Sequence, residues 1–378
     1  MIVIGEQVVS FLEPARLLAN HRAELLTGFE RVLDEGEAGP GGEAGSLERE
    51  FASRFGSPHA LTLSSGFAAL HLALLAVGAG RGDEVILPSN GPVAAAEAVA
   101  ATGARPVFAD VEATGFALDP RDVERRVTPN TKAVIAVHLY GEMANMPELQ
   151  RVTRAAGAAL IEDASAAVGA VLNGAAAGTI GDIGCFNLAD SIGSEKLTGA
   201  LLVTANGAFA ERVAMLRNNG GDEHGAYQEP AFDYRMTEFQ AAALRVVLPH
   251  FAEWTDARQA AAALYDAELS RSPLTLPGGG VYQRYVIRTR YRSALQEYLA
   301  EERIEAVVSP AVPLHLQPAY AEGAKPGDLP NTEALSREML SLPMHPLITQ
   351  DEILAVARAV RQFGKFSAAM MREAAGAA

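Results

Sequence analysis

Short apolar runs alternate with amphipathic segments between residues 60 and 217. Runs of this length favour buried strands, whereas apolar positions repeated every three or four residues favour helices. We expect strands at 60–63, 84–87, 106–109, 133–137, 158–162, 183–188 and 201–204. Helices are expected between them at 67–77, 92–101, 147–156 and 207–217. Strands alternating with helices predict a mostly parallel seven-stranded sheet with helices on both faces, an α/β fold.

The pattern differs at the two ends of the chain. Helices are predicted at 14–35 and 46–55 before the alternating region, and a long helical stretch at 237–270 follows it. Beyond a Gly-rich turn at 277–280 we expect strands at 281–288 and 304–308 and helices at 293–302 and 350–363. This predicts a large α/β domain with an N-terminal helical segment at 1–249 and a small C-terminal α+β domain at 250–378.

Composition narrows the possible functions. The chain has 378 residues and a net charge of −15, and an acidic surface disfavours nucleic-acid binding because phosphate contacts need basic residues. The single cysteine, Cys185, excludes a disulfide framework and favours a reducing compartment. The N-terminus does not resemble a signal peptide, and no apolar run is long enough to span a membrane. We therefore expect a cytoplasmic protein.

Four groups of motifs recur in a fixed order: SSGFAALHLAL at 64–74 with GDEVI at 82–86; VHLYG at 137–141 with IEDA at 161–164; GDIGCF at 181–186 with MLRNNG at 215–220; and YRMTEFQAA at 234–242 with PLHLQPAY at 313–320. In order and spacing the chain resembles the DegT/DnrJ/EryC1/StrS family of sugar aminotransferases from about residue 12 to 364. The resemblance implies a fold-type-I enzyme that uses pyridoxal phosphate (PLP) and forms a dimer with active sites at the subunit interface. Typical members aminate a nucleotide-linked keto-sugar.

PLP transamination needs a lysine that holds the cofactor aldehyde. In the family this lysine follows the GDIGCF motif by six residues, which is Ile192 here, or Ser191 when counted back from the strand ending at Thr204. Neither side chain can form an imine. Lys196 is the only lysine between Lys132 and Lys325, and its use would require an insertion before it and a deletion after it.

Other positions that the resemblance assigns to the cofactor have also changed. Those near the phosphate are Phe67 in place of threonine, Asn187 in place of a hydroxyl residue, and Asp233 in place of the partner subunit's asparagine. Those near the ring are Pro92 in place of an aromatic residue and Ala166 in place of Gln or His. Only Asp163, at the position that binds the pyridine nitrogen, is retained. A carboxylate at a strand end can also cap the next turn.

These substitutions lead us to predict a PLP-independent enzyme of biosynthesis, with no cofactor or metal, that uses the former aminotransferase pocket for acid–base chemistry. Cyclisation, dehydration, condensation or hydrolysis of a sugar- or ketone-like intermediate would fit. The predicted catalytic residues are Asp163, Asp190, Ser191 and His138. The predicted substrate-binding residues are Phe67, Asn90, Pro92, Tyr140, Asn187, Ile192, Arg235 and Ser309. His138 also suits a hydrogen-bonding role in the core, and Arg235 suits either a structural role or an anionic substrate.

Two alternatives remain open from the sequence. The chain could be a non-catalytic subunit that pairs with a pathway enzyme, or a PLP-dependent sugar aminotransferase that uses Lys196. In each case the expected partners are a small-molecule intermediate and a second copy of the chain, with pockets at the interface, and neither nucleic acid nor a membrane.

Overall fold

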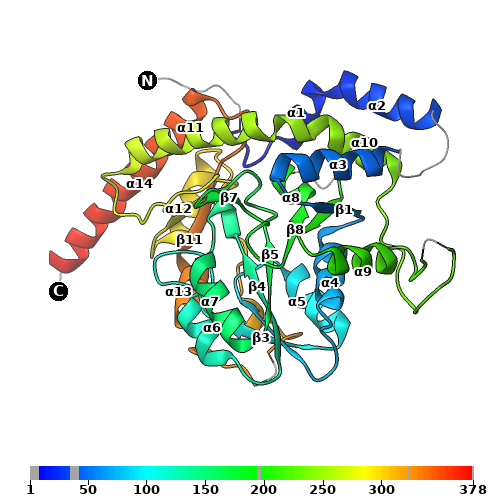
Figure 1. Ribbon diagram of the computed structural model, residues 1–378. Helices are drawn as coiled ribbons and strands as arrows, with labels where there is room; N and C mark the ends of the chain where they lie inside the picture. The colour runs from blue at the N-terminus through cyan, green and yellow to red at the C-terminus, as the bar shows by residue number, and fades with distance from the viewer. Residues whose placement is uncertain (1–7, 35–41, 194–196, 223, 322, 377–378) are drawn as a thin grey trace.

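A seven-stranded sheet forms the centre of the computed structural model, with strand order β1-β9-β8-β5-β4-β2-β3 (Figure 1). The structure describes residues 8–34, 42–193, 197–222, 224–321 and 323–376, without the side chains after residue 364. The strands are β1 (His59–Leu63), β2 (Glu84–Pro88), β3 (Arg105–Ala109), β4 (Thr131–Val137), β5 (Ala159–Asp163), β8 (Ile183–Asn187) and β9 (Ala200–Thr204). The pairs that β9 forms with β1 and β8 are antiparallel, and the other pairs of the sheet are parallel. The predicted mostly parallel sheet is confirmed.

Successive side chains of each strand point to opposite faces of the sheet, so both faces are apolar and helices cover both. In β4, Ala133, Ile135 and Val137 face the core beneath one helix layer, whereas Val134 and Ala136 face the opposite core. The first layer contains α4 (Gly66–Ala76), α5 (Val93–Thr102) and α9 (Gly207–Arg217). The second contains α3 (Glu43–Phe55), α6 (Pro120–Arg126), α7 (Met146–Ala156), α8 (Leu188–Ile192) and α10 (Glu238–Val247).

The small domain packs around its own apolar core. Its elements are α11 (Phe251–Leu269), β10 (Tyr285–Arg288), α12 (Arg292–Glu301), α13 (Pro330–Glu338), β11 (Met339–Leu342) and α14 (Gln350–Gly376). Helix α11 belongs to both cores, since Phe251 and Trp254 pack in the large domain and Tyr265 and Leu269 in the small one. The division near residue 250 that the sequence suggests therefore falls at the start of a shared helix.

Three element predictions needed correction. The helix expected at 14–35 is two helices, α1 (Pro14–Asn20) and α2 (Arg22–Asp34), which meet at His21. The stretch at 237–270 is divided by a 3₁₀ turn, η2 (Leu248–His250). The strand expected at 304–308 is absent from this described segment, which forms only isolated bridges to residues 9 and 341.

Two further 3₁₀ turns are η1 (Leu139–Gly141) and η3 (Leu314–Leu316), and a short hairpin joins β6 (Val171–Leu172) to β7 (Ala175–Ala176).

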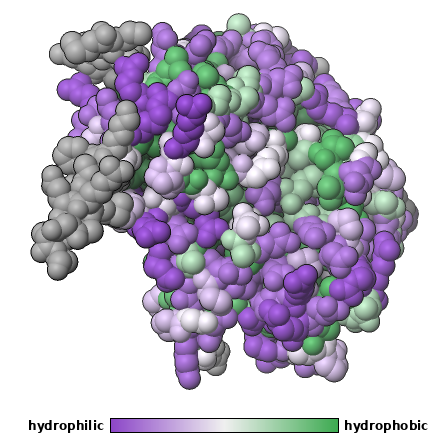
Figure 2. All heavy atoms as spheres, turned by 90° about the vertical axis from the view of Figure 1, so that its left-hand side faces the viewer, coloured by the Kyte–Doolittle hydropathy of each residue, from purple (hydrophilic) through white to green (hydrophobic). Residues whose placement is uncertain are grey.

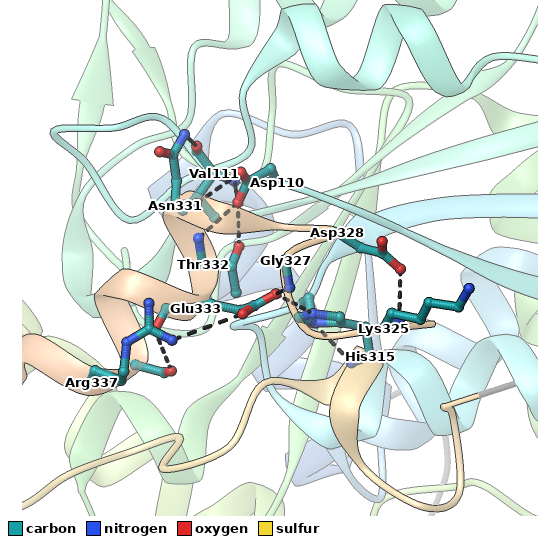
Figure 3. Close-up of polar contacts among 12 residues, drawn as sticks. Asp110, Val111, His315, Lys325, Gly327, Asp328, Asn331, Thr332, Glu333 and Arg337 are labelled. Atoms are coloured by element: carbon teal, nitrogen blue, oxygen red, sulfur yellow. Dashed lines mark hydrogen bonds and ion pairs between the residues drawn. The ribbon is translucent and has the colours of Figure 1, made fainter. Parts of the chain in front are cut away.

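Two buried joints fix the small domain against the sheet (Figure 3). Asp110, directly after β3, accepts hydrogen bonds from the backbone N–H groups of Asn331 and Thr332 at the start of α13. The ring of His315 lies 2.7 Å from the Ser89 hydroxyl through Nδ1, and Nε2 faces Glu333 at 3.4 Å. Both joints lie beyond the carboxyl ends of β2 and β3, and they hold the neighbouring segment 309–320 over the edge of the sheet.

The surface of the small-domain side is mainly hydrophilic with separate apolar patches (Figure 2). Within the part of the chain that the structure describes, no helix is both long and apolar enough to cross a membrane.

Candidate active site

A cavity of about 740 Å³ opens beyond the carboxyl ends of β2, β4 and β5. Ligands in open α/β sheets bind at this edge. Residues 309–320 and the segment before β10 form its opposite wall, so both domains contribute. Seven of the residues predicted from sequence line the cavity: Asn90, Pro92, His138, Tyr140, Asp163, Asp190 and Ser309. The structure therefore brings together residues from distant parts of the chain, while their individual roles stay predictions.

His138 and Glu162 form a buried pair next to the cavity. His138 Nδ1 accepts a hydrogen bond from the Ala144 N–H at 3.1 Å, so the other nitrogen, Nε2, donates to Glu162 at 2.8 Å. Glu162 also accepts backbone hydrogen bonds from Gly178 and Gly181. Burial raises the pKa of Glu162, but these hydrogen bonds outweigh it and leave the pKa below its ordinary value. Both nitrogens of His138 are engaged by protein groups, an arrangement that suits a positioning role.

Asp163 ends β5 and is 4% exposed. The hydroxyl and N–H groups of Ser165 both donate to its Oδ1 atom, at 2.5 and 3.2 Å. Burial raises the pKa of this carboxyl above its ordinary value despite the two hydrogen bonds. Ser165 also accepts hydrogen bonds from the Asn187 N–H and, through its carbonyl, from the Ser191 hydroxyl. Sequence reasoning missed Ser165, which connects Asp163 to helix α8.

Helix α8 places the residue at the expected lysine position in the core. Ile192 is 5% exposed and belongs to an apolar cluster with Leu17 and Leu188. The Asn187 side chain packs against Gly66 so closely that a Cβ there would lie 2.7 Å from the Asn187 Cβ. Neither Ile192, Asn187 nor Ser191 lines the cavity, and the predicted catalytic Ser191 instead bonds to a carbonyl. Lys196 lies outside the described residues.

Two further predicted contacts lie away from the cavity. Phe67 is half-buried and packs near the rings of His71 and Tyr234. Arg235 binds both oxygens of Asp233, at 2.8 and 2.9 Å, in an exposed ion pair. The Arg235 guanidinium holds the pKa of Asp233 below its usual range. The charge of Asp233 is thus paired within this chain.

Arg284 is the residue at the cavity that sequence reasoning most clearly missed. Its guanidinium carbon lies 5.8 Å from the ring centre of Tyr140 and 5.7 Å from that of Phe11. Its Nη1 atom is buried and has no hydrogen-bond partner among the described residues. Buried guanidinium groups normally have an acceptor. The available signal was a charged residue directly before the apolar strand β10.

Tyr140 and Asp190 complete this wall. The Tyr140 hydroxyl donates to the carbonyl of Ser309, and burial raises the pKa of this phenol well above its ordinary value. The Gln283 side chain donates to the carbonyl of Asp190 at 3.0 Å, which ties the small domain to α8. Contacts that cross the two domains therefore form this wall of the cavity.

This fold and cavity define a fold-type-I aminotransferase architecture. The sequence pattern of the DegT/DnrJ/EryC1/StrS aminotransferase family matches residues 20–361, and the chain belongs to this family.

Individual proteins of this family are similar to the chain along most of its length. The chain is 37% identical over 366 residues to dTDP-3-amino-3,4,6-trideoxy-alpha-D-glucose transaminase of Streptomyces venezuelae, covering 94% of this chain and 96% of that one. It is 36% identical over 348 residues to UDP-N-acetyl-3-dehydro-alpha-D-glucosamine 3-aminotransferase of Acidithiobacillus ferrooxidans, covering 90% and 94%. The crystal structure of DesV from S. venezuelae matches with a TM-score of 0.89 and 36% identity, covering 94% of this chain and 98% of DesV.

These relatives correct the functional prediction made from sequence. Proteins 30–37% identical along nearly the whole chain are named as sugar aminotransferases. The prediction of a PLP-independent enzyme without a cofactor is therefore wrong, and the aminotransferase alternative, with PLP as cofactor, is supported. The prediction had given the substituted cofactor contacts more weight than the likeness of the rest of the chain.

The described residues fit PLP at one end. The buried carboxylate of Asp163 reaches the cavity and suits the pyridine nitrogen, and Pro92 and Ala166 give apolar walls. Ser65, in the motif before α4, does not line the cavity, and its hydroxyl accepts a hydrogen bond from the Ala68 N–H as the cap of that helix. No lysine lines the cavity among the described residues. They account for binding of the ring and do not supply a covalent link.

Proposed function

We propose that this protein is a PLP-dependent aminotransferase that acts on a nucleotide-linked keto-sugar. The observation that carries the proposal is its likeness, along more than nine-tenths of its length, to a transaminase of a dTDP-linked amino sugar. Lys196 is the candidate for the covalent link, because it is the only lysine between Lys132 and Lys325.

When bound, PLP would supply an electron sink for the carbon that exchanges its amino group. The part played by the chain is positioning. The Asp163 carboxylate would face the ring nitrogen, and Ser165 holds that carboxylate in place. His138, whose ring is held by Glu162, supports the same strand end, since its backbone N–H donates to the Asp163 carbonyl.

The substrate side of the proposal rests on Arg284. It is the only arginine or lysine among the described residues that line the cavity. A guanidinium with a buried, unpartnered N–H suits an anionic group such as a carboxylate or phosphate. Both the sugar nucleotide and an amino-acid donor carry such groups, so we assign Arg284 to substrate binding.

We also propose a cytoplasmic homodimer with the cavity at the subunit interface. Several large apolar side chains of the large domain are exposed in the single chain, among them Phe239 at 45% and Tyr227 at 76%. Exposed apolar groups of this kind suit a protein contact. The lone, buried thiol of Cys185 agrees with a reducing compartment.

A labelling experiment tests the function. The purified protein is incubated with PLP, reduced with borohydride, digested and analysed by mass spectrometry, and transamination of a dTDP- or UDP-linked keto-sugar from glutamate is measured in parallel. We expect the label on the peptide containing Lys196. Amine formation should be lost in Lys196→Ala and retained in the control Lys325→Ala.

Two outcomes would overturn the assignment. Unchanged turnover in Lys196→Ala would remove this lysine from the chemistry. An unlabelled protein that promotes transamination only after a pathway enzyme is added would instead indicate a non-catalytic partner subunit.

A further inference from the structure

A group of three potential metal ligands, none of which lines the cavity, lies where the N-terminal helices meet the helical stretch after residue 237 (Figure 1). His21 occupies the turn between α1 and α2, Glu24 lies in the first turn of α2, and His250 ends the 3₁₀ turn before α11. One ligand atom from each of these side chains lies within 4.8 Å of the other two. We propose that His21, Glu24 and His250 form a binding site for a divalent metal ion of the zinc type.

The distances are close to those of a coordination shell. The Glu24 carboxylate approaches His21 Nδ1 at 3.6 Å with one oxygen and His250 Nε2 at 3.9 Å with the other. Ligand atoms about 2.0–2.2 Å from a tetrahedral zinc ion lie roughly 3.4 Å apart. Small side-chain movements would therefore bring all three groups into contact with one ion.

The His21 ring carries a buried polar atom that the described residues leave unsatisfied. Its Nδ1 atom is buried and has no hydrogen-bond partner among the described residues, although the ring is next to a carboxylate. A buried ring nitrogen without a partner carries a desolvation cost, which a metal ion would offset. Two histidine nitrogens and one carboxylate oxygen are a common ligand set for zinc.

The surroundings also resemble a metal site. The second nitrogen of His250, Nδ1, faces the Glu253 carboxylate at 3.6 Å, and a carboxylate behind a histidine ligand orients the ring and raises its basicity. Trp254, which is 4% exposed, stacks against His250 with ring centres 6.0 Å apart and closes one side with an apolar surface. The carboxylates of Glu24 and Glu253 provide two negative charges to balance a divalent ion.

An ion at this position would connect elements that are distant in sequence. It would fix the turn between α1 and α2 to the turn before α11, and so hold the N-terminal helices on the large domain. The site is separate from the cavity and does not depend on the proposed transamination.

Calorimetric titration of the full-length, chelator-treated protein with Zn²⁺ tests the proposal. We expect one ion per chain and a higher melting temperature in its presence. His250→Ala and Glu24→Gln should weaken binding at least tenfold and abolish the thermal shift, and Glu253→Gln should weaken it roughly 10- to 100-fold. Glu24 is 58% exposed, so Glu24→Gln should fold normally. It therefore provides the test even if His250→Ala does not fold.

His224→Ala is the matched control, because His224 is an exposed histidine in the segment after α9. Its zinc binding should equal that of the unmodified protein. The proposal is overturned if the protein takes up no Zn²⁺, if His250→Ala and Glu24→Gln bind it as tightly as the control, or if His224→Ala abolishes binding.

Discussion

The end of β5 and helix α8 border the same cavity, but they are stabilised in opposite ways. At the end of β5, Glu162 and Asp163 are buried carboxylates whose oxygens accept hydrogen bonds from His138, Ser165 and backbone N–H groups. In α8, Ile192 is buried among apolar side chains. Asp163 of β5 lines the cavity, whereas α8 reaches it only through Asp190 and buries Ile192 away from it. The charged groups that line the described cavity beside this edge are therefore Asp163 of β5, Asp190 of α8 and Arg284 of the small-domain wall.

Removal of the central carboxylate should have the largest effect. Glu162→Ala leaves three backbone N–H groups and His138 without their acceptor in a fully buried site. Breaking a buried pair by removing one partner costs about 3–5 kcal/mol. We expect a loss of this size in the free energy of unfolding, measured with urea.

The control for Glu162→Ala is Glu148→Ala. Glu148 is 51% exposed and forms a surface ion pair with Arg151, so its loss should change stability by less than about 0.5 kcal/mol. Equal losses in the two variants would show that the β5 network is not the stabilising element that its geometry indicates.

A lysine placed in α8 tests the apolar packing around Ile192. Ile192→Lys puts an ammonium group into the cluster around Leu17 and Leu188, and we expect a destabilisation of about 3 kcal/mol. Ile192→Val, the control, should cost about 1 kcal/mol. If Ile192→Lys is as stable as the parent and reacts with PLP, the side chain at 192 reaches the cavity and the comparison fails.

The small-domain wall is tested by Arg284→Gln. Loss of a charge-assisted hydrogen bond costs about 1.5–3 kcal/mol, so kcat/KM for the anionic substrate should fall about ten- to a hundredfold. Arg290→Gln removes an exposed arginine of the same domain outside the cavity and should leave kcat/KM unchanged. An equal, small effect of both substitutions would exclude Arg284 from substrate binding.

The smallest effect concerns pH. Burial raises the pKa of Asp163 in the folded protein, so over the range above its ordinary value of 3.8 the folded state binds more protons than the unfolded state. Its contribution to stability is therefore lost as pH rises through that range. Asp163→Asn does not titrate, so its stability relative to the parent should improve as pH rises from acidic to neutral. Urea unfolding at several pH values measures this, and a pH-independent difference would contradict it.

The strands of the sheet were predictable because they are short apolar runs bounded by turns. Helix α8 was not, because five residues are too few to show a helical period. The strand predicted at 304–308 failed for a tertiary reason. Its segment is apolar, but Ile304 and Val307 each meet a different partner through a single bridge.

Only the part of the candidate site that lies in the sequence motifs was predictable. Asp163 and His138 follow consecutive strands of a parallel sheet, whose carboxyl ends meet at one edge, so their proximity follows from the alternating pattern. Ser165 carried no signal of its own. Arg284 was marked only as a charged residue directly before β10, and its place at the cavity depends on the small domain folding back over the sheet.

The sequence by itself determined the family and the layered α/β fold, because hydrophobic periodicity and ordered motifs are local properties of the chain. Only the tertiary structure decided which polar groups share a site. It buried Ile192 in a core, paired Asp233 with Arg235, and left the Nη1 atom of Arg284 buried without a hydrogen-bond partner among the described residues. It also brought the rings of His21 and His250 together, although most of the large domain's sequence separates them. Helix packing makes this contact, and the sequence pattern of neither helix predicts it.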